Sequence, residues 1–451
     1  MKLLMEIISK INGVLWGPVM LFFLLGTGVL FTVKLRFIQI RRFKDIWRET
    51  FGGIFNKKEK ADENGISSFQ ALTTAIAAQV GTGNLAGVAT AIAAGGPGAI
   101  FWMWLSGFLG MGTIFGEAVL SQLYTEKVDG ELTGGPAYYI KNGLNSKFLA
   151  GFFAIAIVLA LGFMGNMVQS NSISEAAYVA FNIPKLVTGG FVAALVGLII
   201  IGGINRIASF TEKIVPFMAG LYIIGALTIV IMNYNQILPA FKMIFIGAFN
   251  PMAATGGIIG ASIKEAFRYG VARGLFSNEA GMGSTPHAHA IAKVDHPAQQ
   301  GLVAIMGIII DTGIVCTLTA LVILTTGSLS TGLNGSQLTQ EAFIRGLGTH
   351  GATFVAICLF FFALSTIIGW YYFGESNIKY LFGKKGIGFY RVFVLSFIIL
   401  GTAMKVEIVW ELADTFNGLM VIPNLLALLG LVSLVVKSTN EYESKGEHSK
   451  I

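Results

Sequence analysis

Long apolar stretches recur along the whole chain of 451 residues, and they restrict its possible folds more than any other feature. The hydrocarbon core of a bilayer is about 30 Å thick and is crossed by roughly 20 apolar helical residues. Eleven stretches are predicted to span it, at residues 13–33, 68–94, 98–124, 149–180, 186–205, 211–232, 258–291, 298–326, 351–380, 388–403 and 406–436. They are continuous runs without the alternation of β-barrel strands, and lipid leaves unpaired backbone groups unsatisfied. We therefore expect an all-α polytopic membrane protein with eleven transmembrane helices.

The composition excludes most soluble classes of protein. Apolar residues make up 54% of the chain and charged residues 12%, whereas a soluble domain has about 25% charged residues. So few charges could not cover this much apolar surface in water. The net charge of +7 does not indicate nucleic-acid binding, because the basic residues fall between apolar spans rather than on one soluble face. The expected partner is the lipid bilayer, with no nucleic acid and no obligate protein partner.

The distribution of basic residues predicts an orientation in the cell membrane. Loop 34–67 is rich in lysine and arginine, and if it is cytoplasmic and each span crosses once, most of the 31 basic residues lie inside. The positive-inside rule then places the N-terminus outside and the C-terminus in the cytoplasm. The polar tail 437–451 is expected to be cytoplasmic and disordered.

Two of the predicted spans contain an internal break. In residues 75–95, Gly81 and Gly83 flank Thr82 amid strong helix formers. In residues 274–284, a run of polar residues at 277–279 sits among three glycines. Each glycine costs about 1 kcal/mol relative to alanine inside a helix. Both places are therefore predicted to be unwound joints.

The two breaks occupy corresponding positions in two halves of the chain. They lie five spans apart, so their helices cross the membrane in opposite directions, and such a pair is the best sequence pointer to a transporter site. A single glycine pair is more often a packing feature of membrane helices, but two matched polar breaks favour a binding site. The predicted units are a leading helix with a basic loop (1–67), a first five-helix repeat (68–232), a second inverted repeat (233–436) and the tail (437–451).

A broken helix exposes backbone groups that could bind a zwitterion. Free N–H groups begin the second half-helix and carry partial positive charge, while free carbonyls end the first half and carry partial negative charge. The amides of residues 82–84 are candidates for a carboxylate. The carbonyls near Ala78, Phe276 and Asn278 are candidates for an ammonium group or Na⁺. One pocket with both poles fits an amino acid.

Four stretches identify a resemblance that runs over nearly the whole chain. They are QVGTGNLAGVATAI (79–92), GGPGAIFWMWLSGFLGMGTIFGEAVLSQLY (95–124), GGPAYYI (134–140) and RYGVARGLFSNEAGMGSTPHAHA (268–290). The chain resembles the alanine or glycine:cation symporter family, the sodium–alanine symporters. The resemblance implies a leucine-transporter-type fold of two inverted five-helix repeats, with 13–33 as an extra N-terminal helix. It also implies symport of a small neutral amino acid, alanine or glycine, with Na⁺ by alternating access, with no enzymatic activity and no cofactor besides the coupling ion.

The resemblance further implies two sets of site residues. The implied substrate-binding residues are Gln79, Thr82, Gly83, Asn84, Phe163, Gln169, Phe276, Asn278, Gly281 and Trp370. The implied Na⁺ ligands are the carbonyls of Ala77 and Val80 and the hydroxyls of Ser365 and Thr366, oxygen donors that suit a hard cation. Trp370 and Phe163 either wall a small side-chain pocket or pack between helices, and Gln169 either contacts the ligand or bridges helices.

Buried acidic residues are functional candidates by default in a membrane protein. We expect Glu279, in the second break, to cap the free amides that follow it. Glu117 and Asp311 either tie the broken segments to neighbouring helices or couple a cation to transport. Arg273, one turn before the second break, is expected to tie helices together.

Other functions remain open at this point. An H⁺-coupled or uncoupled amino-acid permease would share both breaks. An ion channel would need a ring of pore charges, and a membrane-embedded enzyme would need a catalytic constellation. The sequence shows neither of these two patterns.

Overall fold

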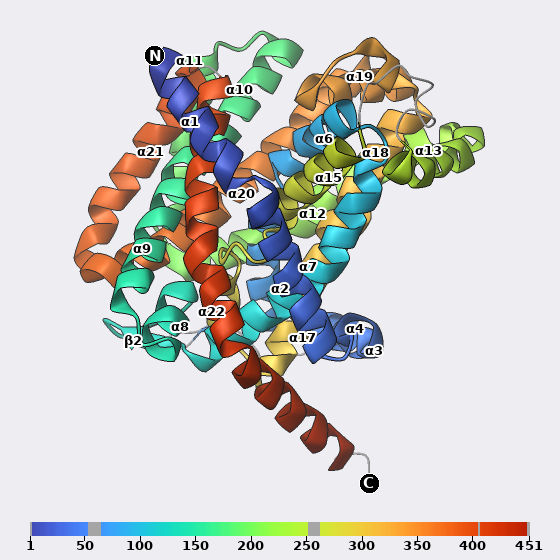
Figure 1. Cartoon of the computed structure of the whole chain (residues 1–451). Helices are drawn as coiled ribbons and strands as arrows, with labels where there is room; N and C mark the ends of the chain where they lie inside the picture. The colour runs from blue at the N-terminus through green and yellow to red at the C-terminus, as the bar shows by residue number, and fades with distance from the viewer. Residues whose placement is uncertain (1, 53–64, 251–261, 405, 449–451) are drawn as a thin grey trace.

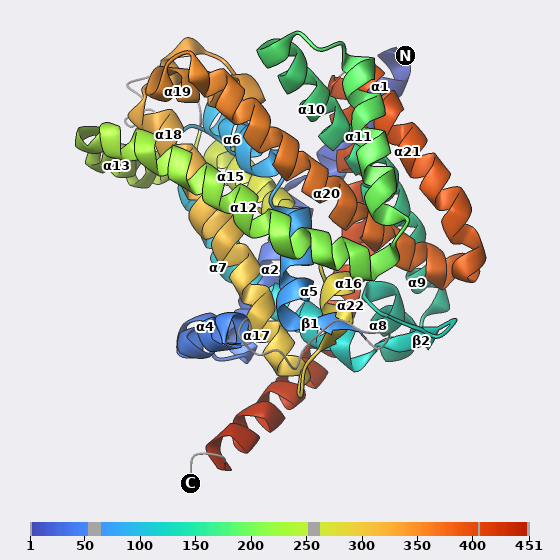
Figure 2. The same cartoon turned by 180° about the vertical axis from the view of Figure 1, so that it is seen from behind.

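The computed structural model describes residues 2–52, 65–250, 262–404 and 406–448, and within them it is a bundle of helices (Figure 1). The helices of the first half are α1 (Lys2–Leu15), α2 (Pro18–Lys34), α3 (Ile38–Arg41), α4 (Phe43–Phe51), α5 (Ser68–Gln79), α6 (Val88–Gly95), α7 (Ala99–Leu123), α8 (Pro136–Gly143), α9 (Lys147–Ile157), α10 (Asn166–Phe181), α11 (Lys185–Ile200) and α12 (Gly203–Met232). Those of the second half are α13 (Ile237–Phe249), α15 (Ile263–Asn278), α16 (Pro286–Ala290), α17 (Pro297–Ile308), α18 (Thr317–Thr325), α19 (Gly335–Leu347), α20 (His350–Phe382), α21 (Ile387–Ala403) and α22 (Val406–His448). Figure 2 shows α12 crossing one face of the bundle obliquely, where it contacts α5 and α20.

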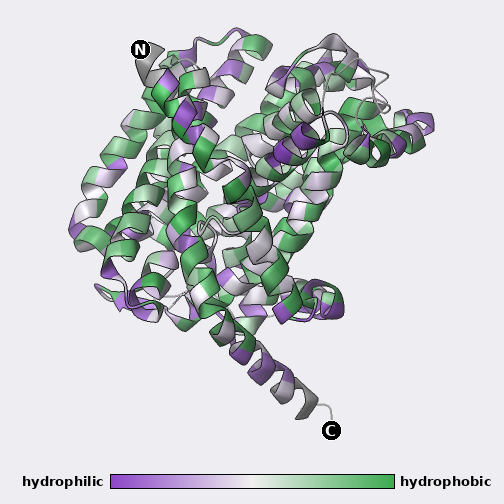
Figure 3. Cartoon of the chain, in the orientation of Figure 1, coloured by the Kyte–Doolittle hydropathy of each residue, from purple (hydrophilic) through white to green (hydrophobic). Residues whose placement is uncertain are grey.

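Several described helices can cross a membrane. By length and composition, seven helical segments are long and apolar enough, or eight if the bent pair formed by α5 and residues 83–95 counts as one span. Hydrophobic residues colour most of the bundle, and hydrophilic ones gather toward its ends, most plainly on the last part of α22 (Figure 3). The predicted class of polytopic helical membrane protein is confirmed. The count of eleven spans stays a prediction, because α11 has only 16 residues and His350–Ala403 forms one long helical segment.

Two short sheets are present, and one of them joins segments that are distant in sequence. Strand β1 (Ile66–Ser67) pairs in parallel with β4 (Ala292–Lys293), and β2 (Glu126–Val128) pairs antiparallel with β3 (Glu131–Thr133). Strand β1 directly precedes α5, and β4 closely follows α16. The start of one broken helix is thus tied to the end of the other.

One expected boundary lies outside the described residues, and one expectation about the tail is contradicted by the structure. Residues 258–261, the start of one predicted span, lie outside the described residues. The predicted disorder of the tail is wrong for 437–448, because α22 continues to His448. The extension is held by Glu443, whose carboxylate lies 2.6 Å from the Arg41 guanidinium and 3.4 Å from that of Arg42. Ion pairs between distant parts of the chain therefore order a segment that its composition predicts to be disordered.

Both broken helices begin with the same local signal. Ser67 and Gln70 form a capping box at the start of α5, and Ser262 and Glu265 form one at the start of α15. Such reciprocal hydrogen bonds satisfy the free amides of a first helical turn. The start of each half-helix is therefore stabilised by its own capping residues, whatever the conformation of the break at its other end.

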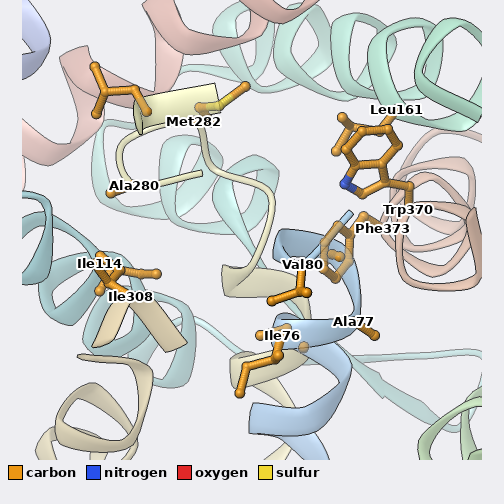
Figure 4. Packing of buried hydrophobic residues seen from close by; sticks show 14 of the residues in the cluster. Ile76, Ala77, Val80, Ile114, Leu161, Ala280, Met282, Ile308, Trp370 and Phe373 are labelled. Carbon is orange, nitrogen blue, oxygen red and sulfur yellow. The ribbon is translucent and has the colours of Figure 1, made fainter. Parts of the chain in front are cut away.

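Two π-helical segments adjoin the breaks. Segment η1 (Gly83–Gly87) follows the first break directly, and η4 (Ile309–Cys316) joins α17 to α18 and contacts both η1 and α15. Such bulges occur frequently at functional sites of membrane and soluble helices. Figure 4 shows the surrounding packing, with Val80 beside Trp370 and Phe373 of α20, near the irregular segment that carries Ala280 and Met282.

Candidate binding site between two broken helices

The first predicted break is present in the structure. Helix α5 ends at Gln79, Val80 takes an extended conformation with ψ of 93°, and the two halves of the span are bent by 51°. Where the backbone leaves the helix, its N–H and C=O groups lose their partners within the helix and can bind other groups. The prediction of an unwound joint around Gly81 is confirmed.

The four implied Na⁺ ligands lie together. The Thr366 hydroxyl lies 3.0 Å from the Ala77 carbonyl and 3.3 Å from the Val80 carbonyl, and the Ser365 hydroxyl lies 3.3 Å from the Ala77 carbonyl. All four residues are fully buried. Oxygen atoms at these separations can surround one hard cation, since such ions take several hydroxyl and carbonyl oxygens at once.

Gly81 is essential to this geometry, although the implied site residues do not include it. A Cβ atom at Gly81 would lie 2.5 Å from Oγ1 of Thr366. At Gly83 the nearest atom would be Cα of Ser277 at 3.4 Å, an ordinary contact. The glycine that allows close approach between α5 and α20 is therefore Gly81, whereas Gly83 leaves room beside Phe276.

Backbone donors at the first break face polar side chains. The Gly81 amide donates to Oδ1 of Asn84 at 2.9 Å, and the Thr82 amide donates to Oε1 of Gln169 at 3.4 Å. The Gln169 amide group in turn donates to the Thr82 hydroxyl at 3.1 Å. A ligand carboxylate could replace either amide oxygen as the acceptor, because a charged acceptor forms the stronger hydrogen bond.

The second predicted break is also present. Helix α15 ends at Asn278, and Glu279, Gly281 and Gly283 have positive φ values of 58°, 82° and 79°. Glycine adopts this left-handed region without steric cost, which explains two of the three residues. The chain regains helical structure only at Pro286. The broken region here is longer than at the first joint.

The predicted capping role of Glu279 is wrong, and Glu117 performs it. Glu117, on α7, accepts the Gly281 amide at 3.1 Å and the Gly283 amide at 3.0 Å. The side chain of Asn424, on α22, donates to the same carboxylate at 2.7 Å. Glu279 precedes these amides in a left-handed turn, and its carboxylate accepts instead from Trp370 Nε1 at 2.6 Å.

Removing the Glu117 carboxylate is expected to destabilise the protein strongly. In Glu117→Ala the buried amides of Gly281 and Gly283 lose their acceptor, at a cost of about 1–3 kcal/mol each. Thermal unfolding in detergent, monitored by size-exclusion chromatography of heated samples, should show a much lower midpoint temperature for the variant than for the wild type. The matched control is Glu341→Ala, which removes only a partly exposed ion pair with Arg345. Equal midpoints for the two variants would contradict this role of Glu117.

Asp311 connects the two breaks. Its Oδ1 atom accepts from Asn84 Nδ2 at 2.6 Å and from the Ser277 hydroxyl at 2.9 Å. A further bond runs directly between the joints, from Gln79 Nε2 to the Asn278 carbonyl at 2.7 Å. These contacts support the tie between helices, which is one of the two roles left open for Asp311. A part in cation coupling stays a prediction.

The aromatic residues divide into two groups. The ring of Phe276 lies beside Gly83 and 5.4 Å from the ring of Trp410 on α22. Phe163 lies elsewhere, because its ring packs against α21, 4.8 Å from Phe397 and 5.8 Å from Tyr390. The structure therefore removes Phe163 from the residues around the first break.

The contacts of Trp370 are compatible with both roles left open for it, a wall of the side-chain pocket and packing between helices. It lies one helical turn after Thr366, and its indole nitrogen binds Glu279. A Cβ atom at Gly165 would lie 2.6 Å from its ring, so η2 (Val158–Gly165) approaches α20 closely there. Trp370 thus ties three segments together beside the implied cation ligands.

Arg273 contacts two aromatic rings and an acid near the second break. Its guanidinium lies 5.6 Å from the Trp410 ring centroid, 6.0 Å from that of Phe276 and 3.9 Å from the carboxylate of Asp414. Cation–π contacts of this kind contribute about 0.5–2 kcal/mol. These contacts agree with the expected tie between helices. Sequence analysis missed Trp410, which stands in no recognisable motif.

Two cavities open toward opposite ends of the bundle. The larger, of about 1140 Å³, is lined by Trp410, Asn171 and Gln340, among others, and reaches the Phe276–Trp410 pair. The smaller, of about 690 Å³, is lined by Glu131 and Lys379 near the β2–β3 hairpin. The site lies between the two, which suits a binding position near the middle of the bundle.

Ion pairs lie at the rim of the smaller cavity. The Lys379 ammonium lies 2.8 Å from the carboxylate of Glu131 and 3.1 Å from that of Glu375, and Lys384 lies 3.1 Å from Glu131. Partial burial opposes ionisation of Glu131, but hydrogen bonds and charges from Lys379 and Lys384 outweigh it and lower the pKa of this carboxyl. The hairpin is thus fastened to the end of α20.

The sequence model of the sodium:alanine symporter family matches residues 1–450. The chain belongs to this family. Among relatives of this family member, the sodium/alanine symporter AgcS of Methanococcus maripaludis is 44% identical over 446 residues, covering 97% of each chain. The probable sodium/glutamine symporter GlnT of Bacillus subtilis is 41% identical over 451 residues, covering 100% of this chain and 93% of the relative.

Solved structures share the fold of this sodium:alanine symporter family member. MhsT, crystallised with L-phenylalanine, matches with a TM-score of 0.57 at 13% identity, over 84% of this chain and 98% of that one. The manganese transporter of Eremococcus coleocola matches with a TM-score of 0.52 at 16% identity, over 79% and 75% of the two chains. The chain is therefore a multi-pass membrane transporter of the amino-acid symporter class, and not an enzyme.

Proposed function

We propose that this protein carries a small neutral amino acid, alanine or glycine, across the cell membrane together with Na⁺ by alternating access. The observation that carries the proposal is the convergence of Ala77, Val80, Ser365 and Thr366 beside the first broken helix. Four buried oxygens suit a hard cation, and the same joint presents backbone donors that suit a carboxylate.

We propose eleven transmembrane helices arranged as two inverted five-helix repeats, 68–232 and 233–436, after a leading unit 1–67. The parallel pairing of β1 with β4 supports opposite directions for the two broken helices, because it joins the start of one to the end of the other. The capping boxes that begin α5 and α15 add a second similarity between the halves. The N-terminus then lies outside and the tail 437–451 in the cytoplasm.

The amino acid binds, in this proposal, with its carboxylate at the amides of Gly81 and Thr82. The carboxylate displaces the side-chain oxygens of Asn84 and Gln169 that accept from these amides. The side chain of the substrate faces Phe276, and Trp370 stands on the opposite wall one turn from Thr366. Aromatic side chains on two sides of the proposed site restrict the size of the substrate side chain, which favours alanine and glycine.

Coupling follows from the adjacency of the two ligands. Na⁺ would be held by the carbonyls of Ala77 and Val80 and the hydroxyl of Thr366. It would thereby fix the break at the end of α5 against α20. The next residue, Gly81, donates to the substrate carboxylate. Each ligand therefore stabilises the backbone geometry that the other requires, and each must raise the affinity of the other by the same factor.

Uptake into proteoliposomes tests the proposal. We expect saturable uptake of labelled L-alanine or glycine under an inward Na⁺ gradient, and almost none when choline replaces Na⁺. Uptake driven by external acid without Na⁺ would contradict Na⁺ coupling and indicate an H⁺-coupled permease. Uptake independent of both gradients would indicate an uncoupled permease, and ion flux without amino acid would indicate a channel.

A further inference from the structure

A short helical arm follows the first span. Helices α3 and α4 are separated only by Arg42, after a turn in which Arg36 and Phe37 have positive φ values of 54° and 55°. Figure 1 shows the arm extending sideways from the end of α2. One side of the arm, including the buried Ile46, faces the bundle, where α4 packs against α17.

The opposite side of the arm carries two parallel stripes. Phe43 and Trp47 lie four residues apart on α4, which places them on one face, and their exposed fractions are 51% and 57%. Ile40, near the end of α3, is 61% exposed as well. Lys44 and Arg48 repeat the four-residue spacing one residue later, about 100° around α4, and Arg41 is the exposed last residue of α3. We name these six residues the basic–aromatic face.

The apolar stripe continues a surface that already faces outward. Val33 at the end of α2 is 57% exposed, and Phe37 before α3 is 47% exposed. In a span that crosses the membrane, exposed apolar side chains of this kind lie against lipid. The stripe of the arm therefore prolongs a lipid-facing surface around the corner at the end of the span.

Acidic residues compensate the basic stripe only in part. Arg41 pairs with Glu443, and Arg48 pairs with Asp45 and Glu49, so Lys44 is the stripe residue whose charge has no partner among the described residues. Among the described residues, the side chains of Lys34, Arg36 and Lys44 are exposed and have no hydrogen-bond or ion-pair partner. The two acids of the arm, Asp45 and Glu49, are partly buried and engaged by arginines of the arm itself. The exposed charge of the arm is therefore positive.

We propose that the basic–aromatic face binds anionic phospholipid at the membrane surface, with the apolar stripe among the upper acyl carbons and the basic stripe at the headgroups. Basic helices with such a face lie in the interface, and each lysine or arginine there adds attraction to an anionic surface. Under the orientation proposed above, this lipid belongs to the cytoplasmic leaflet. Continuity with the surface of α2 favours lipid over a protein partner.

Fluorescence quenching of Trp47 by brominated lipids tests the proposal without relying on transport. The full-length protein is reconstituted in phosphatidylcholine vesicles with increasing fractions of brominated phosphatidylglycerol. Subtracting the signal of Trp47→Phe isolates the quenching of Trp47. We expect brominated phosphatidylglycerol to quench Trp47 at a lower fraction than brominated phosphatidylcholine.

A matched pair of charge variants makes the test specific. Lys44→Gln should raise the fraction of phosphatidylglycerol required for half-quenching about fivefold. Lys385→Gln removes another exposed lysine, in the turn after α20 and away from the arm, and should leave it unchanged. Equal quenching by the two lipids, no quenching by either, or equal effects of the two variants would overturn the proposal. Because the readout is lipid contact, failure of the proposed Na⁺ coupling would leave it unaffected.

Discussion

Gly81→Ala is expected to reduce Na⁺-dependent amino-acid uptake to background while the protein still folds and inserts. The added Cβ atom would lie 2.5 Å from Oγ1 of Thr366, so α5 and α20 must separate by about 1 Å to restore ordinary contact. That movement pulls the carbonyls of Ala77 and Val80 away from the two hydroxyls. Labelled-alanine uptake into proteoliposomes, normalised to reconstituted protein, measures the effect.

Gly87→Ala is the matched control. Gly87 belongs to the same broken span, but a Cβ atom there meets nothing within 4 Å. We expect near-normal uptake, since a glycine-to-alanine change inside a helix is otherwise mildly stabilising. Wild-type uptake by Gly81→Ala, or equal losses in both variants, would contradict the importance of close approach at the cation ligands.

Thr366→Val is expected to have the second large effect, a large loss of apparent Na⁺ affinity. Valine keeps the shape of threonine but removes the hydroxyl that lies 3.0 Å from the Ala77 carbonyl and 3.3 Å from the Val80 carbonyl. A hydrogen bond or ligand contact to a charged group contributes about 1.5–3 kcal/mol, so the apparent Na⁺ affinity should fall about 10- to 100-fold. The measurement is alanine uptake as a function of Na⁺ concentration.

Thr366→Ser separates the hydroxyl from the methyl group. Serine retains the oxygen and should keep a Na⁺ dependence close to that of the wild type, with a modest loss from the missing methyl group. If serine and valine variants had the same Na⁺ dependence, the hydroxyl would not be a cation ligand. The pair therefore tests ligand chemistry rather than packing at α20.

The positions of the two breaks could be predicted from the sequence, because glycines and polar residues interrupt otherwise strong helix formers at 81–83 and 277–283. The proposed cation ligands followed from a resemblance and from the adjacency of Ser365 and Thr366 on one helix. Local sequence carries both kinds of information, and the structure places these residues together.

Other features depended on which helices are neighbours, and local sequence does not contain that information. Glu279 stands next to the free amides in the chain, yet Glu117 binds them because α7 packs against α15. The ring of Phe163 packs against α21, and Trp410 of the last helix lies beside Phe276. Both positions depend on which helices are neighbours. The 437–448 segment is helical because Arg41, nearly the whole chain away, pairs with Glu443.

Reciprocal binding tests the central claim most directly. In the proposed mechanism Na⁺ and the amino acid share one backbone joint, so titration calorimetry of the purified protein should show alanine affinity rising with Na⁺. It should also show Na⁺ affinity rising with alanine by the same factor, as linkage requires. An alanine affinity that is identical in Na⁺ and in choline would contradict the account.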